Sequence, residues 1–418
     1  MSALLDSLVV GFEGDAGQRS LLDDVLRDGL PAARNESWKY TSLRALDRRV
    51  FAPSQTDVTV DVDVLADIPA PRLVFVNGRF HAAHSSVADL PDGVVLRSRS
   101  NATQLPTDRT LPGTTAASRD GVFARLALAL ATDGVMLQVG DGVRASEPIQ
   151  LVFLGEMAPA DVASHLSHLI TLGSGASATV VEHHRHGQAH GNLSNALIRI
   201  ELAPSATLLH ARIQEESTRA TVLASTDVHL ADNARYQRID LELGAALSRH
   251  DLTIQLQGTG AHVSANGVLL GTGRRHIDTQ LGVEHLGRDT TCDLLWRGLG
   301  AGRSRTVFHG GIVIQQGADG ADACLSNKNL LLGEGAEIDT QPVLEIHADE
   351  VKAAHGATVG QLDPTAMFYL RSRGLTESDA RRLLTSAFCR EVTVSAPAAV
   401  RDVLTRALER SLATLDPE

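Results

Sequence analysis

A short turn motif recurs from about residue 170 onward, and it constrains the fold more than any other feature of the chain. The motif has the form Gly/Ala-x-small-Ala and reads GSGA at 173, APSA at 203, ADNA at 231, GTGA at 258 and GEGA at 333. The first four copies are spaced by 27 to 30 residues, with two strand-like runs between successive copies. This period predicts a β-solenoid, in which each coil buries its apolar face only by stacking on its neighbours.

A large β-sandwich is the alternative, because its strands also recur at a spacing of about 8 to 12 residues. The chain has 418 residues, which is long for one ordinary core and suits either several domains or an elongated repeat architecture. Aromatic residues make up only 3% and glycine occurs 36 times. This composition favours a core of aliphatic residues threaded between many tight turns.

Helices are expected on both sides of this β region. Residues 1–52 are expected to form an N-terminal helical region, in which Leu22 and Val25 share a helical face that ends at Gly29. Short β-rich runs follow Pro53, and the segment VFARLALALATDG interrupts them as a helix. After Pro364 two amphipathic helices are expected, the first with Thr376 and Asp379 in capping-box spacing. The apolar stripes expected on them comprise Ala380, Leu383, Leu384, Ala387 and Phe388, then Val400, Val403, Leu404, Ala407, Leu408 and Leu412.

Charge and cysteine usage exclude several classes of protein. The net charge of −12 argues against nucleic acid or an anionic membrane as the main partner. The three cysteines are widely spaced, which fits a reducing cytosol and offers no disulfide framework. Because the N-terminus lacks a signal-peptide pattern and no long apolar run follows, we expect a soluble cytoplasmic protein. The chain also lacks a P-loop motif, so it is not itself a P-loop ATPase.

Histidine is the most conspicuous chemical group. Twelve of the 17 histidines lie between residues 165 and 285, and EHHRHGQAH (182–190) is the densest cluster. His184 and His186 would share one face of a strand and could seat a metal. No carboxylate or cysteine recurs at a fixed ligand spacing, so an exposed polar strand face is the favoured interpretation.

The remaining candidates give weak signals when taken alone. His355, in front of Gly356, is expected to be a turn residue at the last coil. Cys292, Cys324 and Cys389 have no partner nearby in the sequence and are expected to be small buried hydrophobes.

Several sequence motifs, taken together, resemble those of the SufB/SufD family of iron-sulfur cluster assembly proteins. They are NESWKYTSL (35–43), NGRF (77–80), LSRHDLTIQLQG (247–258), ANGVLL (265–270), SNKNLLLGEGAEIDTQPVLEI (326–346), HGATVGQLD (355–363) and FYLRSRGL (368–375). The resemblance spans nearly the whole chain and is most specific from residue 326 to 375. The chain is similar to the SufD members, since it is short for SufB and lacks the additional cysteines of that paralogue; a SufB-like paralogue is the alternative.

The resemblance implies a mainly β fold: a right-handed parallel β-helix core flanked by N-terminal and C-terminal α-helical regions. It implies a core at 53–363 with an irregular N-terminal part, and a C-terminal helical domain at 364–418 that docks the SufC ATPase. It further implies a non-catalytic scaffold subunit that pairs with SufB through the β-helix. No nucleic acid or membrane partner is expected. Whether the isolated protein forms a homodimer stays open.

In this family resemblance, His355 stands at the motif position of a histidine that ligates a nascent cluster at the interface with SufB. We therefore expect His355 to be the metal ligand, with no catalytic residue and no tightly bound cofactor. The cluster would be transient and shared with SufB, and whether reduced flavin binds the complex stays open. Many family members carry a cysteine just before this segment, whereas Ala353 and Ala354 stand here. Asp349 and Glu350 could act as second-shell acceptors for the imidazole.

Two other classes of function compete with this interpretation. A β-helix enzyme acting on polysaccharide would need clustered Asp, Arg and aromatic residues along a groove, and aromatics are scarce here. A free-standing iron-sulfur protein would need a set of cysteine ligands that three scattered cysteines do not supply.

Overall fold

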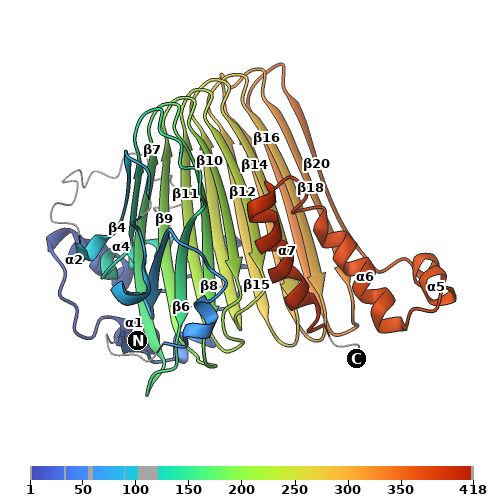
Figure 1. The fold of residues 1–418 in the computed structure, drawn as a ribbon, viewed down its shortest axis with the longest axis horizontal. Helices are drawn as coiled ribbons and strands as arrows, with labels where there is room; N and C mark the ends of the chain where they lie inside the picture. Colours follow the sequence, from blue (N-terminus) through green and yellow to red (C-terminus); the bar gives the residue numbers. More distant parts are fainter. Residues whose placement is uncertain (1, 33, 55–59, 89, 102–120, 416–418) are drawn as a thin grey trace.

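The computed structural model describes residues 2–32, 34–54, 60–88, 90–101 and 121–415, and its centre is an elongated parallel β-solenoid (Figure 1). Two sheets run along the solenoid, and successive strands of the chain alternate between them. The first sheet contains, in spatial order, β19 (Glu337–Ile346), β17 (Arg305–Ile314), β15 (His276–His285), β13 (Leu247–Leu256), β11 (Thr221–Leu230), β9 (Leu193–Leu202), β7 (Val162–Leu172), β5 (Val135–Val139) and β4 (Val94–Ser98), with β1 (Ala52–Pro53) beside β7. The second contains β20 (Lys352–Gly360), β18 (Asp322–Leu331), β16 (Thr291–Gly300), β14 (His262–Gly271), β12 (Arg235–Glu242), β10 (Thr207–Gln214), β8 (Ser177–His186), β6 (Ile149–Gly155), β2 (Arg72–Val76) and β3 (Arg79–Phe80). The expected parallel β-solenoid is confirmed, and the sandwich alternative is wrong.

The recurring turn motif forms a corner of successive coils. Its third residue has a left-handed backbone in the first four copies, with φ of 65° at Gly175, 61° at Ser205, 57° at Asn233 and 68° at Gly260. Glycine and asparagine enter this region at low cost, which explains the small or flexible residue at the third position. The alanine at the fourth position is buried in each of these copies: Ala176, Ala206, Ala234 and Ala261. The period therefore records backbone conformation and close stacking of the coils.

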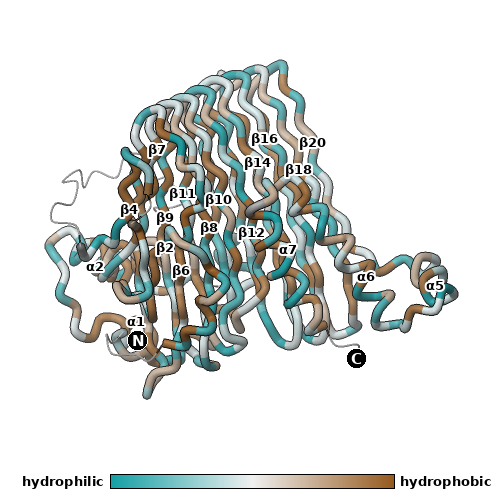
Figure 2. The backbone as a smooth tube through the Cα atoms, in the orientation of Figure 1, coloured by the Kyte–Doolittle hydropathy of each residue, from teal (hydrophilic) through white to brown (hydrophobic). Residues whose placement is uncertain are grey.

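The solenoid interior is a mainly apolar core between the two sheets. Alternate residues of a strand face this core, and Figure 2 shows hydrophobic and hydrophilic segments interspersed along the solenoid strands. Trp296 is fully buried and packs 5.0 Å from Phe308, measured between ring centroids. A Cβ at Gly267 would approach the Trp296 ring to 2.2 Å. Gly267 is therefore required on the coil beneath this ring.

The N-terminal helices cover the outer face of the first sheet. They are α1 (Ala3–Leu8), α2 (Ala16–Asp28) and α4 (Val122–Leu130). The expected helices around Leu22 and in VFARLALAL are confirmed, and α2 ends at Gly29 as expected. Leu22 and Leu126 pack in one cluster with Leu193 and Leu223 of the solenoid. This cluster seals the sheet over the early coils.

The C-terminal helices are α5 (Pro364–Ser372), α6 (Glu377–Arg390) and α7 (Ala398–Leu412). Figure 1 shows α7 lying across the second sheet, while α6 and α5 extend beyond the last coil. The sequence predicted only two helices here, although α5 has a clear start signal: Asp363 caps it by accepting from the Thr365 N–H, and Pro364 occupies its first turn. The expected domain boundaries after residues 52 and 363 stay predictions. Within the described part of the chain, no helix has the length and apolar character needed to cross a membrane.

Candidate functional site at the open end of the solenoid

The last coil leaves one end of the solenoid uncovered. Strands β19 and β20 are the terminal strands of the two sheets, and each is paired with a neighbour on one side only among the described residues. Ile346 and Val359, one at the end of each strand, are both 44% exposed. An edge of this kind presents unpaired backbone N–H and C=O groups together with apolar side chains. It is therefore a ready surface for a further strand or coil.

His355 lies within β20, so the interpretation of this residue as a turn residue is wrong. Its pairing partner in β18 is Leu325, which is 2% exposed and belongs to the interior core. Residues paired in register in parallel strands project from the same face of the sheet. The imidazole therefore stands in an interior column, yet it is exposed because no further coil covers it. The extended run from Lys352 onward explains the strand, since Gly356 continues the ladder with ordinary pairing to Ser326.

No thiol shares the face that carries His355 in this strand. Ala353 packs partly buried against the interior core, and Ala354 pairs with Cys324 of β18. Alternation places Ala354 and Cys324 on the outer face, opposite to His355. Cys324 is exposed, which corrects the expectation that it is buried, whereas Cys292 and Cys389 are buried as expected.

Asp349 and Glu350 lie at the corner before β20 and not beside His355. The stretch from Lys352 to His355 alone spans about 10 Å in an extended strand. The suggestion that these carboxylates orient the ring stays a prediction.

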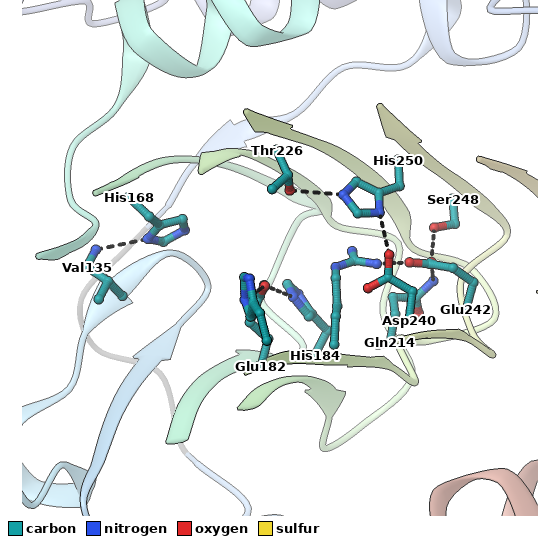
Figure 3. A network of polar contacts seen from close by, with 12 residues as sticks. Val135, His168, Glu182, His184, Gln214, Thr226, Asp240, Glu242, Ser248 and His250 are labelled. Atoms are coloured by element: carbon teal, nitrogen blue, oxygen red, sulfur yellow. Dashed lines mark hydrogen bonds and ion pairs between the residues drawn. The ribbon is translucent and has the colours of Figure 1, made fainter. Parts of the chain in front are cut away.

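The histidine-rich region proves to be buried, so the exposed strand face expected for His184 is also wrong. Figure 3 shows imidazoles and carboxylates from several strands converging inside the solenoid. Glu182 lies 2.5 Å from Nε2 of His210 and 3.1 Å from Nε2 of His184. Nearby, Arg238 donates to Asp240 over 2.5 Å. The polar side chains enclosed here are His168, Glu182, His184, His210, Arg212, Gln214, Thr226, Arg238, Asp240, Glu242, Ser248 and His250; we call them the sealed network.

Opposite charges alternate along one interior column of the sealed network. Glu182 of β8 pairs with Arg212 of β10, which pairs with Asp240 of β12. Arg212 also forms an ion pair with Glu242. Burial raises the pKa of Glu182, but the neighbouring His210, His184 and Arg238 outweigh that effect and hold it well below its usual range. The carboxylate is therefore ionised within a closed set of partners.

Hydrogen-bond donors fix two imidazoles of the sealed network as neutral. Nδ1 of His168 accepts from the Val135 N–H over 2.9 Å, and Nδ1 of His210 accepts from Arg238 over 2.7 Å. A ring nitrogen that accepts a hydrogen bond carries no proton. Burial accordingly lowers the pKa of His168 to about 4. The charged side chains of the network are buried against oppositely charged neighbours, which suits a structural role in aligning coils.

The described residues contain no cluster of three or more His, Cys, Asp and Glu side chains that could hold a metal ion. His184 and His186 therefore have no third protein ligand among these residues. Cys292 lies 3.3 Å from Nε2 of His285, but both are buried. Burial also raises the pKa of the Cys292 thiol to about 12, which keeps it protonated. A metal bound at His355 would therefore need ligands from another molecule.

The C-terminal helices differ in how firmly the solenoid holds them. The stripe expected on α7 is confirmed, with Leu404 and Ala407 completely buried against the second sheet. In α6, by contrast, Leu383 is 50% exposed and Ala387 is exposed, so the stripe expected there is partly wrong. The buried positions of α6 are Ala380, Thr385 and Cys389. The helix turns this other face inward because its C-terminal end is tied to the solenoid.

That tie is made by Arg297 of β16, a side chain only 1% exposed that neither composition nor spacing singled out. Its guanidinium donates to Glu391, which caps α6, over 2.6 and 3.1 Å, and lies 5.5 Å from the centre of the Phe388 ring. Beyond this tie, α5 has no buried residue and Phe368 is 74% exposed. The far end of α6 and α5 thus projects a free surface.

A groove of about 1040 Å³ lies between α5, α6 and the corner after β18. Its lining includes the apolar Leu331, Met367, Phe368 and Leu375, the basic Arg371 and Arg381 and the acidic Glu334 and Glu377. Mixed apolar and charged lining of this kind suits a protein partner.

Comparison with known proteins gives the same family along almost the whole chain. Residues 155–388 match the family profile described as SUF system FeS cluster assembly, SufBD core domain, and residues 18–151 match the SufBD protein N-terminal region. The chain is 32% identical over 391 residues to the iron-sulfur cluster assembly protein SufD of Escherichia coli, covering 91% of this chain and 90% of that protein. It is 31% identical to an iron-sulfur cluster assembly SufBD family protein of Synechocystis, covering 88% and 84%, and 26% identical to SufD of Bacillus subtilis, covering 90% and 88%. The β-solenoid, its flanking helices and these matches together establish that the chain belongs to the SufB/SufD family of the SUF iron-sulfur cluster assembly system.

Proposed function

We propose that the chain is a scaffold subunit of a SufB–SufC–SufD complex that assembles iron-sulfur clusters, and that it fills the SufD position. The observation that carries the proposal is His355, an exposed imidazole in an interior column at the uncovered coil of a SufB/SufD-family solenoid. The family assignment favours assembly over the alternative of a polysaccharide-acting enzyme. The scaffold performs no catalytic step of its own.

The open end is the proposed interface with SufB. Strands β19 and β20 offer free edges to which a partner's terminal coil adds as two further strands. The addition would bury Ile346 and Val359 and complete the ladder on both sheets. When SufB is absent, the same end would pair with a second copy of this chain and give a homodimer.

His355 is the proposed ligand for the nascent cluster, which is the cargo of the complex and not a resident cofactor. A neutral imidazole binds iron as a borderline ligand and releases it more readily than a set of thiolates does. Because Ala353 and Ala354 supply no sulfur and Cys324 faces the other side of the sheet, SufB would provide the thiolates. The cluster would then form only in the assembled interface.

The free surface of α5 and α6 is the proposed docking site for the SufC ATPase. Its groove combines exposed Phe368 with side chains of both charges, whereas α7 has its apolar stripe committed to the solenoid. Phe368→Glu should lower co-purification of SufC at least tenfold, or about 1.4 kcal/mol. Val62→Glu, at an exposed apolar position near the N-terminus, is the matched control. Equal loss in both variants would argue against docking at α5.

The test of the site compares His355→Ala with His347→Ala in the co-expressed three-protein complex. His347 is an exposed histidine at the same end, directly after β19, and therefore controls for loss of an imidazole as such. We expect both variants to assemble with SufB and SufC, and only His355→Ala to lose cluster build-up, measured by visible absorbance under anaerobic reconstitution. Normal cluster formation in His355→Ala would remove this residue from the proposed site.

A further inference from the structure

The last two coils contain an unusual set of polar side chains in an apolar interior. Asn327 and Asn329 of β18 are 1% and 2% exposed, and they alternate with the outward-facing Lys328. They stand on the same face as Leu325, which belongs to the interior core. These asparagines belong to the motif SNKN of β18. Thr340, which belongs to the motif DTQP of β19, is hydrogen-bonded to Asn327. Two of the motifs that carry the family resemblance are therefore in contact inside the solenoid.

Three hydrogen bonds join the asparagines of β18 to three other strands, and a fourth links the two asparagines to each other. Thr340 donates from Oγ1 to Oδ1 of Asn327 over 2.7 Å, which links β19 to β18 across the interior. Nδ2 of Asn329 donates to the same oxygen over 2.6 Å and to the Thr358 carbonyl of β20 over 2.9 Å. Nδ2 of Asn327 reaches back to the Trp296 carbonyl of β16 over 3.5 Å. The group thus connects both strands of the last coil to the coil beneath it.

The chain accommodates this group at a cost. A Cβ at Gly298, the residue paired with Asn329, would meet Oδ1 of that amide at 2.1 Å, so only glycine admits it. Oδ1 of Asn329 is buried and has no hydrogen-bond partner among the described groups. Leaving a buried acceptor unpaired costs free energy, and an apolar side chain would avoid that cost. The amides must therefore contribute something that hydrophobic packing alone does not.

The coil they hold is the one that needs support. Strands β19 and β20 have a partner on one side only among the described residues, and an edge coil with few buried contacts opens more readily than an internal one. His355 lies in β20, on the same strand as the Thr358 carbonyl that Asn329 binds. We propose that Asn327, Asn329 and Thr340 form an interior staple that positions the last coil and so presents His355 at the open end.

The staple can be tested on the isolated chain by hydrogen–deuterium exchange. The matched pair is Thr340→Val, which removes the hydroxyl at similar volume, and Thr340→Ser, which keeps it; Asn329→Ala breaks the link to β20 directly. Because one hydrogen bond contributes about 0.5–1.5 kcal/mol, we expect about three- to tenfold faster exchange of β19 amides in Thr340→Val and of β20 amides in Asn329→Ala. Exchange in β12 and β14 serves as the internal reference and should not change.

Lys328→Ala is the control, since this side chain lies on the same strand but faces outward. Thr340→Ser and Lys328→Ala should retain native exchange in the last coil. Exchange in Thr340→Val and Asn329→Ala that equals that of Lys328→Ala would overturn the proposal.

The relevance of the staple to cluster assembly rests on the proposed function, and a second measurement separates the two. In the three-protein complex, Thr340→Val should slow cluster build-up about three- to tenfold with co-purification of SufB and SufC unchanged, and Thr340→Ser should restore it. If His355→Ala forms clusters normally, the site assignment fails while the exchange experiment still decides the staple. Native exchange in Thr340→Val overturns the staple whatever His355 does.

Discussion

Two stretches of the solenoid interior contain polar side chains, and they differ in what closes over them. Between β7 and β13 the sealed network combines charged and neutral polar groups under cover, and its carboxylates Glu182, Asp240 and Glu242 all lie against basic partners. In the last coil, neutral amides hold the strands and the imidazole of His355 is open to solvent. A buried charge persists only when it is paired, whereas a group at an open end keeps access to water and to a partner. The dense histidine region is therefore structural, and the candidate site lies at a histidine with sparse surroundings.

The largest expected effect comes from unpairing the sealed network. Arg238 is fully buried and donates to Asp240, Glu182 and His210. Arg238→Met would remove the buried guanidinium that contacts both Asp240 and Glu182, and we expect the free energy of unfolding to fall by about 3–5 kcal/mol. Urea denaturation measures this change.

The control for this variant is Arg288→Met, which removes an exposed ion pair with Asp319. It should change the free energy of unfolding by no more than about 0.5 kcal/mol. Similar denaturation midpoints for the two variants would contradict the view that closed pairs hold the early coils.

Acidification should lower the free energy of unfolding, because the buried imidazoles of the sealed network resist protonation in the folded chain. Burial lowers the pKa of His168 and of His250 to about 4, from an ordinary value of 6.5. Between these two values the unfolded chain binds protons that the folded chain excludes. The free energy of unfolding therefore falls as pH falls from 6.5 toward 4, by up to about 2.7 kcal/mol per pH unit for these two groups, and they add no pH dependence above that window.

The measurement is urea denaturation at several pH values in the native chain and in His168→Gln. His168→Gln should reduce the slope by about 1.4 kcal/mol per pH unit, because one excluded proton is removed. An equal slope in His168→Gln and in the native chain would mean that His168 does not exclude a proton in the folded state.

The smallest effect is expected at Cys324, which lies one strand from the site but on the outer face. Cys324→Ser should leave cluster build-up at the native level and change the free energy of unfolding by no more than about 0.5 kcal/mol. Anaerobic reconstitution and urea denaturation check both. A loss of cluster build-up as large as that of His355→Ala would move the site to the outer face of β18 and β20.

Local patterns predicted much of the fold because the relevant interactions are short-range. The spacing of small turn residues anticipated the corners at Gly175 and Asn233, since left-handed backbone restricts which residues fit there. The apolar stripe of α7 anticipated its buried face around Leu404. The stripe of α6 was only partly correct, because Arg297 and Glu391 set the rotation of that helix through a contact distant in sequence.

The candidate site was predicted by resemblance and not by chemistry visible in the residues themselves. Spacing suggested a turn at His355 and an exposed face at His184, and both interpretations were reversed by the structure. Exposure of a solenoid residue depends on whether a further coil stacks above it, which no window of neighbouring residues records. Nothing in the sequence singled out Asn327 and Thr340 beyond their place in the family motifs, because their contact forms across the solenoid interior.

The sequence by itself therefore determined the repeating coil with its corners, the flanking helices and the family of the chain. Each of these follows from local backbone preference or from sequence motifs. Only the tertiary structure decided which side chains are sealed and which stand open, because stacking fixes burial coil by coil. Glu182 and His210 became a closed pair when the next coil covered them. His355 became the candidate ligand because the chain leaves the solenoid after β20 and no further coil of the described residues covers it.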